Sequence, residues 1–291
     1  MRANKKICNF VVRPCRSWAE ICGITALTLA TLLAWWQPAL AVVPLTVFVA
    51  LCVAAPFFPQ FPFYTETISR GRCGSTAISL TFDDGPSPSS TPLLLDLLAR
   101  YQLTATFFVV GQQAEMYPEL IARILAGGHT IGNHSYDHSY FLMFKSPESL
   151  GNDIEKTQKI LARAGIRPLV FRPPVGIVSP ALIPVLNRSG LKVVNFSCRA
   201  CDRGNKHIDN LASKILHILK PGDILLLHDV SPSERSLAQR WHQEVETLLK
   251  NVAEQHEVIP LQDLIEHPVM MAVSRDEANE PLTIRVVHPH A

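Results

Sequence analysis

The sequence predicts an α/β domain with a parallel sheet or barrel, preceded by an N-terminal transmembrane segment. Two observations carry this prediction. From about residue 75 onward, short β-rich runs alternate with helical patterns at a spacing typical of parallel α/β folds. Before that point, residues 21–65 contain no charged side chain. An apolar run of this length is typical of membrane-spanning segments.

The composition limits the possible functions. The chain has 291 residues, of which 47% are hydrophobic and 18% are charged, and its formal net charge is +2. This length suits one large domain or two small ones. The near-neutral charge argues against nucleic acid as a partner. The seven cysteines are an odd number and only three follow the apolar region, so no disulfide framework is predicted.

Residues 1–20 form a basic segment, and residues 21–58 form the predicted transmembrane region. A spanning helix needs about 20 apolar residues, so the region is too long for one span and long enough for two short ones. Gln37-Pro38 supplies a break between them. A signal peptide and a buried core hairpin are the alternatives. The run far exceeds the roughly 7 to 15 apolar residues of a secretory signal, which favours a two-helix hairpin.

The basic residues before the apolar region predict the orientation of the chain, since such residues stay on the cytoplasmic side. Two spans would return the following domain to the cytoplasm. One long tilted span would place it in the periplasm or outside the cell. In either case we expect a protein of the cell membrane that contacts membrane lipid, with residues 59–74 as a linker.

Each element of the α/β domain has its own signal. Proline at the start of a helix and glycine at its end predict helices from Thr91, Ser146 and Ser179 onward. The β-rich runs between them predict strands at TAISLTF (76–82), TATFFVV (104–110), PLVF (168–171), LKVVNF (191–196), DILLLH (223–228) and EVIP (257–260).

Asp83 and Asp84 follow the first of these strands and precede a Gly85-Pro86 turn. Neighbouring side chains on a regular strand point to opposite faces, so adjacent carboxylates serve one site only where the strand has ended. Two like charges this close need a cation, a proton or solvent between them. The pair therefore indicates a metal site or an acid–base site.

Other polar residues also fall where predicted strands end. Arg172 follows PLVF, and His228 ends DILLLH. Asp229 is open to two interpretations, a partner that orients His228 or an exposed loop charge. His134 and His138 have the HxxxH spacing of metal sites. Two imidazoles and one carboxylate form a ligand set that leaves positions open for water or substrate.

Four motifs carry a family resemblance. TFDDG (81–85), HSYDH (134–138), RPPVG (172–176) and LLH (226–228) resemble, in order and spacing, the motifs of the NodB-type polysaccharide deacetylases, carbohydrate esterase family 4. The resemblance covers residues 75–267 and leaves 268–291 as a peripheral or flexible tail. It implies a distorted (β/α) barrel that hydrolyses an N-acyl group on an amino sugar with the help of a metal ion.

The resemblance also implies a role for each matching residue. It implies one divalent cofactor, with zinc preferred by ligand type and cobalt, nickel or manganese left open. The implied roles are metal ligands (Asp84, His134, His138), general base (Asp83), general acid (His228), orientation of the base (Arg172), the oxyanion donor and its neighbour (Val175, Pro174) and the acyl-methyl pocket (Leu226).

Two departures from the family pattern concern the substrate. Val175 stands where the family often has an aromatic residue, which would open one wall of the sugar groove. In RACDR (199–203), Arg199 and Arg203 replace an acid and a tryptophan, and added arginines favour a phosphate-bearing substrate. We therefore expect deacetylation of a cell-envelope glycan or lipid-linked saccharide. The alternatives are a deformylase of a polyprenyl-phosphate-linked amino sugar and a non-catalytic, membrane-anchored glycan-binding protein.

Overall fold

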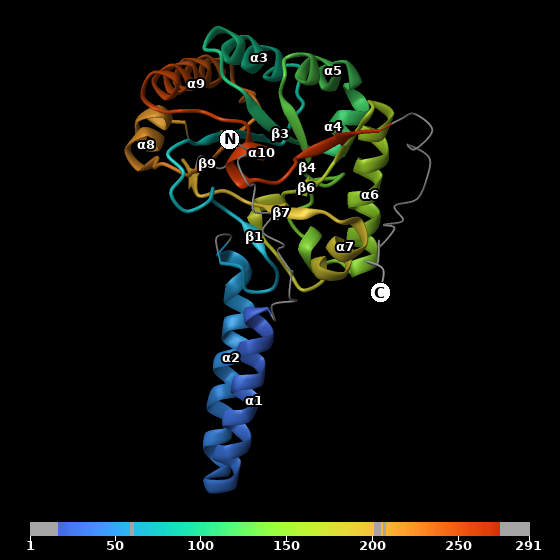
Figure 1. The fold of residues 1–291 in the computed structure, drawn as a ribbon, viewed down its shortest axis with the longest axis vertical. Coiled ribbons are helices and arrows are strands. Elements are labelled where there is room, and N and C mark those ends of the chain that lie inside the picture. The colour runs from blue at the N-terminus through green and yellow to red at the C-terminus, as the bar shows by residue number, and fades with distance from the viewer. Residues whose placement is uncertain (1–16, 59–60, 201–204, 206–207, 274–291) are drawn as a thin grey trace, which may run out of the picture.

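The computed structural model describes residues 17–58, 61–200, 205 and 208–273. It consists of an N-terminal pair of antiparallel helices that extends from one side of an α/β domain (Figure 1). The predicted order, an apolar segment followed by alternating strands and helices, is therefore confirmed.

The N-terminal pair consists of α1 (Trp18–Trp36) and α2 (Val42–Ala54), joined by the 3-10 turn η1 (Pro38–Ala41), and a second 3-10 turn, η2 (Ala55–Phe57), follows. The predicted break at Gln37-Pro38 lies between the helices. By length and composition, Trp18–Trp36 and Pro38–Phe57 could each cross a membrane, with mean hydropathies of 1.4 and 2.4. Only 11% and 6% of these windows are buried, unlike the core helix of a soluble domain.

Small residues bring the two helices together. Ala26 and Ala30 are buried, and a Cβ on Gly23 would lie 3.1 Å from the ring of Phe48. The chain that follows closes over the start of α1, because the N–H of Ala19 donates to the carbonyl of Phe63 at 2.9 Å. This last bond ties the start of α1 to the segment that leads into the domain.

The domain is built on one sheet of eight strands in the order β1-β7-β6-β4-β3-β2-β9-β8, and every pair in it is parallel. The sheet curls into a half barrel, as predicted by the resemblance, with helices on its outside (Figure 1). The strands are β1 (Thr67–Ile68), β2 (Ser79–Asp83), β3 (Ala105–Val109), β4 (Thr130–Asn133), β6 (Val170–Phe171), β7 (Lys192–Val194), β8 (Cys198–Arg199) and β9 (Ile224–His228).

The remaining elements surround this sheet. Ser146 caps its helix as predicted, because its hydroxyl accepts from the N–H of Ser149. The helices and short strands are α3 (Thr91–Arg100), α4 (Gly111–Met116), α5 (Pro118–Ala126), η3 (Leu142–Phe144), α6 (Pro147–Arg163), β5 (Ile166–Pro168), η4 (Pro174–Gly176), α7 (Leu182–Ser189), α8 (Leu211–Ile218), α9 (Arg235–Gln255), α10 (Leu261–Ile265) and β10 (Met270–Ala272).

Alternation along the strands gives the sheet two different faces. Leu80 and Phe82 point outward into a large apolar core formed with α3, α5, α8 and α9. Thr81 and Asp83 point inward, beside their register partners Leu226 and His228 on β9. The inner face has a smaller apolar cluster and then the polar residues at the strand ends. The carboxyl ends of the strands thus place the site inside the curl of the sheet.

Several short strands were not predicted. β4 has the sequence TIGN, and glycine and asparagine are depleted in strands, yet it pairs in the middle of the sheet. β1 lies in the range expected as a linker, and β10 lies in the range expected as a tail. EVIP forms a single bridge, Ile78 to Val258, instead of a strand. Pairing with distant residues, rather than local pattern, decides these short elements.

Candidate active site

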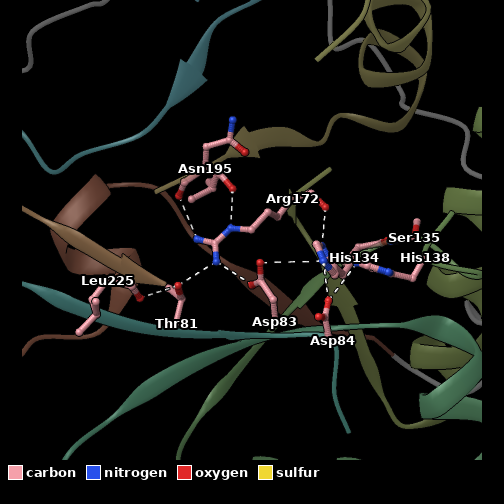
Figure 2. A network of polar contacts seen from close by, with 11 residues as sticks. Thr81, Asp83, Asp84, His134, Ser135, His138, Arg172, Asn195 and Leu225 are labelled. Atoms are coloured by element: carbon pink, nitrogen blue, oxygen red, sulfur yellow. Dashed lines mark hydrogen bonds and ion pairs between the residues drawn. The ribbon is translucent and has the colours of Figure 1, made fainter. Parts of the chain in front are cut away.

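Four strand ends carry the candidate catalytic residues. Asp83 ends β2 and His228 ends β9, and the two are register partners on the inner face. His134 follows the last residue of β4, and Arg172 follows β6. Figure 2 shows the side chains of Asp83, Asp84, His134 and Arg172 pointing toward one another.

The three predicted metal ligands form one cluster. Asp84 Oδ1 lies 3.0 Å from His138 Nε2 and 3.3 Å from His134 Nε2. One candidate ligand atom from each residue lies within 4.8 Å of the other two. Two imidazole nitrogens and one carboxylate oxygen are a ligand set that suits zinc and similar divalent ions. The residues present therefore fit the metal ion that the resemblance implies.

The loop that carries the histidines has an unusual backbone. Ser135 and His138 have φ values of 69° and 50°, and Asp84 has 73°. Each such conformation costs about 1–2 kcal/mol for a residue other than glycine and persists where its surroundings fix it. Asn133 Oδ1 accepts from the Ser135 N–H at 2.9 Å, and the Ser135 carbonyl accepts from Gly111 N–H at 2.8 Å. These bonds fix the turn between the two histidines.

His134 is held for ligation by one hydrogen bond. Its side chain is 2% exposed, and its Nδ1 lies 2.7 Å from the backbone carbonyl oxygen of Arg172. Because a carbonyl only accepts, Nδ1 carries the proton. The lone pair is then on Nε2, which faces Asp84. Metal-binding histidines are commonly oriented by such a second hydrogen bond.

The ligand cluster favours a charged carboxylate. Burial acts to raise the pKa of Asp84, but the neighbouring imidazoles of His134 and His138 outweigh it and hold that pKa well below its usual value. Burial acts to lower the pKa of His138, and Asp84 outweighs it, so that pKa is raised. The carboxylate therefore needs positive charge beside it, which a divalent ion also provides.

Arg172 connects the predicted base to the core. It is fully buried, and one of its Nη atoms donates to Asp83 Oδ1 at 2.7 Å and to Thr81 Oγ1 at 2.8 Å. Its Nε and its other Nη donate to the carbonyls of Val194 at 3.0 Å and Asn195 at 2.9 Å. A buried guanidinium with this many acceptors remains charged and orients the Asp83 carboxylate.

An aromatic ring supports the buried guanidinium. The centre of the Arg172 guanidinium lies 3.9 Å from the ring centroid of Phe108. A Cβ on Gly132 would lie 2.5 Å from that ring, so only glycine leaves room for Phe108 there. Thr81, Phe108 and Gly132 were not predicted as site residues from the sequence. Glycine inside a strand often marks a close approach, but this signal could not be read from the sequence because β4 itself was not predicted.

The RPPVG turn presents a free backbone donor. Val175 has φ 54° and ψ 11°, a left-handed conformation that is rare for a β-branched residue, and it is 45% exposed. Among the described residues, no acceptor receives its backbone N–H. The preceding Pro174 is buried, and Asn195 Nδ2 donates to the carbonyl of Gly176 at 3.2 Å. The turn is thus held with the Val175 N–H available.

The remaining predicted residues differ in their surroundings. Leu226 is 5% exposed and belongs to the inner apolar cluster. His228 is close enough to His138 that charge on the His228 ring acts to lower the pKa of His138, against the larger raising effect of Asp84. Arg199 is exposed, is the register partner of Leu226, and lies 5.2 Å from the ring of Phe196. Arg203 lies outside the described residues.

The interpretation of Asp229 as an exposed loop charge is wrong. Its side chain is buried, and its two oxygens accept from Ser90 Oγ and Thr91 Oγ1, each at 2.6 Å. Burial raises its pKa to about 7, against the lowering effect of the two hydroxyls.

Comparison with known proteins identifies relatives of this chain. A family model described as polysaccharide deacetylase matches residues 70–194. The chain is 38% identical over 154 residues to a peptidoglycan-N-acetylglucosamine deacetylase of Bacillus cereus, covering 52% of this chain and 72% of the relative. It is 37% identical over 163 residues to a chitooligosaccharide deacetylase of Azorhizobium caulinodans, covering 55% and 77%.

Solved structures agree with these relatives. The Bc1960 peptidoglycan N-acetylglucosamine deacetylase superposes with a TM-score of 0.62 at 28% identity, covering 70% of this chain and 94% of that chain. The peptidoglycan deacetylase PdaC of Bacillus subtilis superposes with a TM-score of 0.57 at 28% identity, covering 66% and 90%.

Proposed function

Because the chain belongs to the polysaccharide deacetylase family, we propose that it uses one divalent metal ion to remove an N-acetyl group from an amino sugar of a cell-envelope glycan or lipid-linked saccharide. As an enzyme of this family it is a hydrolase of carbon–nitrogen amide bonds other than peptide bonds. One observation supports the proposal most: the Asp84, His134 and His138 cluster lies beside an Asp83 carboxylate that a buried arginine orients.

Each residue has a chemical task in this reaction. Asp84, His134 and His138 hold the ion, which when bound polarises the acyl carbonyl and makes water easier to deprotonate. Asp83 accepts a proton from the attacking water, and Arg172 holds the Asp83 carboxylate in position through a hydrogen bond.

Three further groups complete the proposed reaction. His228 returns a proton to the departing nitrogen, since an amine leaves readily only when protonated. The N–H of Val175, which the turn at Pro174 presents, donates to the developing oxyanion. Leu226 borders the pocket for the acyl methyl group.

Ligand type favours zinc as the ion. Neutral imidazole suits zinc, copper, iron and nickel, whereas a purely oxygen-ligated site would suit magnesium or calcium. Two of the three candidate ligands are imidazoles. Zinc is therefore our first choice, with cobalt, nickel and manganese as the ions to compare.

The helix pair supports a location at the cell membrane, which is part of the proposal. Its two candidate spans are apolar and largely unburied, as lipid-facing helices are. With two spans, the positive-inside rule puts the domain on the cytoplasmic side. A reporter fused after Thr65 tests this: a cytoplasmic signal supports two spans, and a periplasmic one refutes them.

The proposed reaction is tested on the purified full chain in detergent. Metal content is measured together with acetate and formate release from N-acylated amino-sugar substrates. We expect one ion per chain and release of acetate, with activity abolished in Asp83→Asn and His134→Ala. Only His134→Ala should also lose metal, because Asp83 is not a ligand. A metal-free, inactive wild-type chain would refute the proposal.

The position of Arg199 supports a second candidate, deformylation of a polyprenyl-phosphate-linked amino sugar. The exposed guanidinium lies on the inner-face side of β8, beside Leu226, and no described acidic residue pairs with it. Such a group could bind a substrate phosphate. Arg199→Ala and Arg203→Ala should then weaken turnover of a phosphate-bearing lipid-linked sugar but not of a neutral oligosaccharide. Equal effects on both substrates would exclude this candidate.

A further inference from the structure

Asp229 is a buried carboxyl group that the proposed reaction does not use. It directly follows His228, where the chain leaves β9 and passes the start of α3. Its side chain is fully buried, and both of its oxygens accept hydroxyl hydrogen bonds, from Ser90 and Thr91. Asp229 therefore joins the end of β9 to the beginning of α3.

Asp229 also contacts both sequence neighbours of the metal ligand Asp84. Its backbone N–H donates to the carbonyl of Asp83 at 2.7 Å. On the other side, a Cβ on Gly85 would lie 2.2 Å from Asp229 Oδ2, so the Gly85 backbone packs directly on the carboxylate. Asp84 itself has the left-handed φ of 73°, a conformation that needs fixed surroundings.

The far end of the same loop is tied to the same carboxylate. Thr91 Oγ1 donates to Asp229 and accepts from the N–H of Ser87 at 2.7 Å. The carbonyl of Gly85 accepts from the N–H of Val110 at the end of β3. Residues 84–91 thus close over Asp229.

We propose that Asp229 is a positioning residue: its carboxyl group fixes the loop of residues 84–91 and so places Asp84 against His134 and His138. Asp229 touches neither the ion nor the substrate in this role. The inference rests on the proposed function, because it assumes that Asp84, His134 and His138 bind a metal ion. Its main readout is zinc affinity, which is measured without any substrate.

Asp223, which directly precedes β9, provides a matched control. It is also a buried aspartate, 1% exposed, and accepts from Arg70, from Ser197 Oγ at 2.6 Å and from the Lys220 N–H at 2.7 Å. It lies at the start of β9, at the opposite end from the site. Its loss should therefore weaken the fold without reaching Asp84.

The experiment compares zinc affinity, by competition with a chromophoric chelator, in the full chain in detergent. In Asp229→Val we expect the zinc dissociation constant to rise at least tenfold, with kcat falling more than KM changes. Asp229→Asn should stay within about threefold of wild type, because an amide keeps one acceptor and donates to the other hydroxyl. Asp223→Val should keep native zinc affinity while its unfolding temperature falls.

A double variant covers the case in which Asp229→Val does not fold. Ser90→Ala with Thr91→Val leaves the carboxyl group in place but removes its ties to the loop, and it should weaken zinc binding as well. Native zinc affinity in folded Asp229→Val, or in the double variant, would overturn the inference, as would equal weakening in Asp223→Val. A wild-type chain that binds zinc but releases no acetate would refute the proposed substrate alone.

Discussion

The two faces of the curled sheet use the same strands but bury different chemistry. On the outer face, Leu80 and Phe82 enter one large apolar core with the surrounding helices. On the inner face, one residue further along the strand, Thr81 and Asp83 bond to the buried Arg172. Successive residues of one strand therefore point to opposite faces, so a residue that stabilises the fold is followed directly by one that serves the site.

The faces should also differ in how they respond to substitution. Apolar burial contributes roughly 25 cal/mol per Å², largely independent of orientation. A buried ion pair adds little net stability, but removing one partner leaves an uncompensated charge and costs about 3–5 kcal/mol. We therefore expect outer-face variants to lose stability alone, and inner-face variants to lose activity as well.

The largest effect is expected for Arg172→Met. Asp83 loses its buried partner, so we expect at least a hundredfold fall in kcat and a destabilisation of about 3–5 kcal/mol. Zinc binding should survive, because His134 bonds to the backbone carbonyl of residue 172. Adding Asp83→Asn should restore part of the stability but none of the activity. Retained activity in Arg172→Met would show that Asp83 does not depend on this partner.

Leu80→Ala tests the outer face. Leu80 is fully buried in the large core, and such truncations cost about 2–5 kcal/mol. The midpoint of denaturant unfolding should fall, while kcat and zinc affinity of the folded fraction stay unchanged. A fall in kcat at constant folded fraction would mean that the two faces are coupled.

Asp229 makes stability depend on pH. Its pKa is about 7 in the folded chain, against 3.8 for the ordinary group, because it is buried. The folded state then binds more protons than the unfolded state between these values, so the free energy of unfolding should fall as pH rises from about 4 to 7, by up to about 4 kcal/mol. Asp229→Asn should flatten this slope. An unchanged slope in that variant would assign the dependence to another group.

Gly132→Ala should have the smallest effect that still distinguishes the faces. The added Cβ would meet Phe108 at 2.5 Å and disturb the ring beneath Arg172, at a cost of about 1–3 kcal/mol with some loss of kcat. Gly151→Ala is the control. It lies in α6 with no atom nearer than 3.6 Å to its Cβ, so it should leave kcat unchanged and stabilise by up to about 1 kcal/mol.

The sequence predicted the long and strongly patterned elements well. The strand ending in Asp83-Asp84, the strand ending in His228 and the helix capped by Ser146 are all present. It failed for β4 and for the short strands β1, β8 and β10, whose two to four residues have no period to detect. Their existence depends on pairing with residues far away in the chain.

The candidate site was predicted in the same uneven way. The candidate metal cluster of Asp84, His134 and His138 was predicted from spacing and motif, and the three side chains do meet. The residues that support this cluster were not predicted. Phe108 and Gly132 pack beneath Arg172, and Asp229 bonds to Ser90. No local sequence pattern connects the residues in these contacts. The environment of Asp229 could not be predicted from the sequence either, because the burial of Asp229 depends on how α3 packs at the end of β9.

By itself, the sequence determined which residues can do chemistry and the order of strands and helices that carries them, because motifs, caps and alternation are local properties of the chain. Only the tertiary structure decided which strand ends meet, that Arg172 is buried against Asp83, and that Asp229 lies beneath the loop of Asp84. These are contacts between residues about 90 to 140 positions apart, and their geometry follows from the register and curl of the whole sheet.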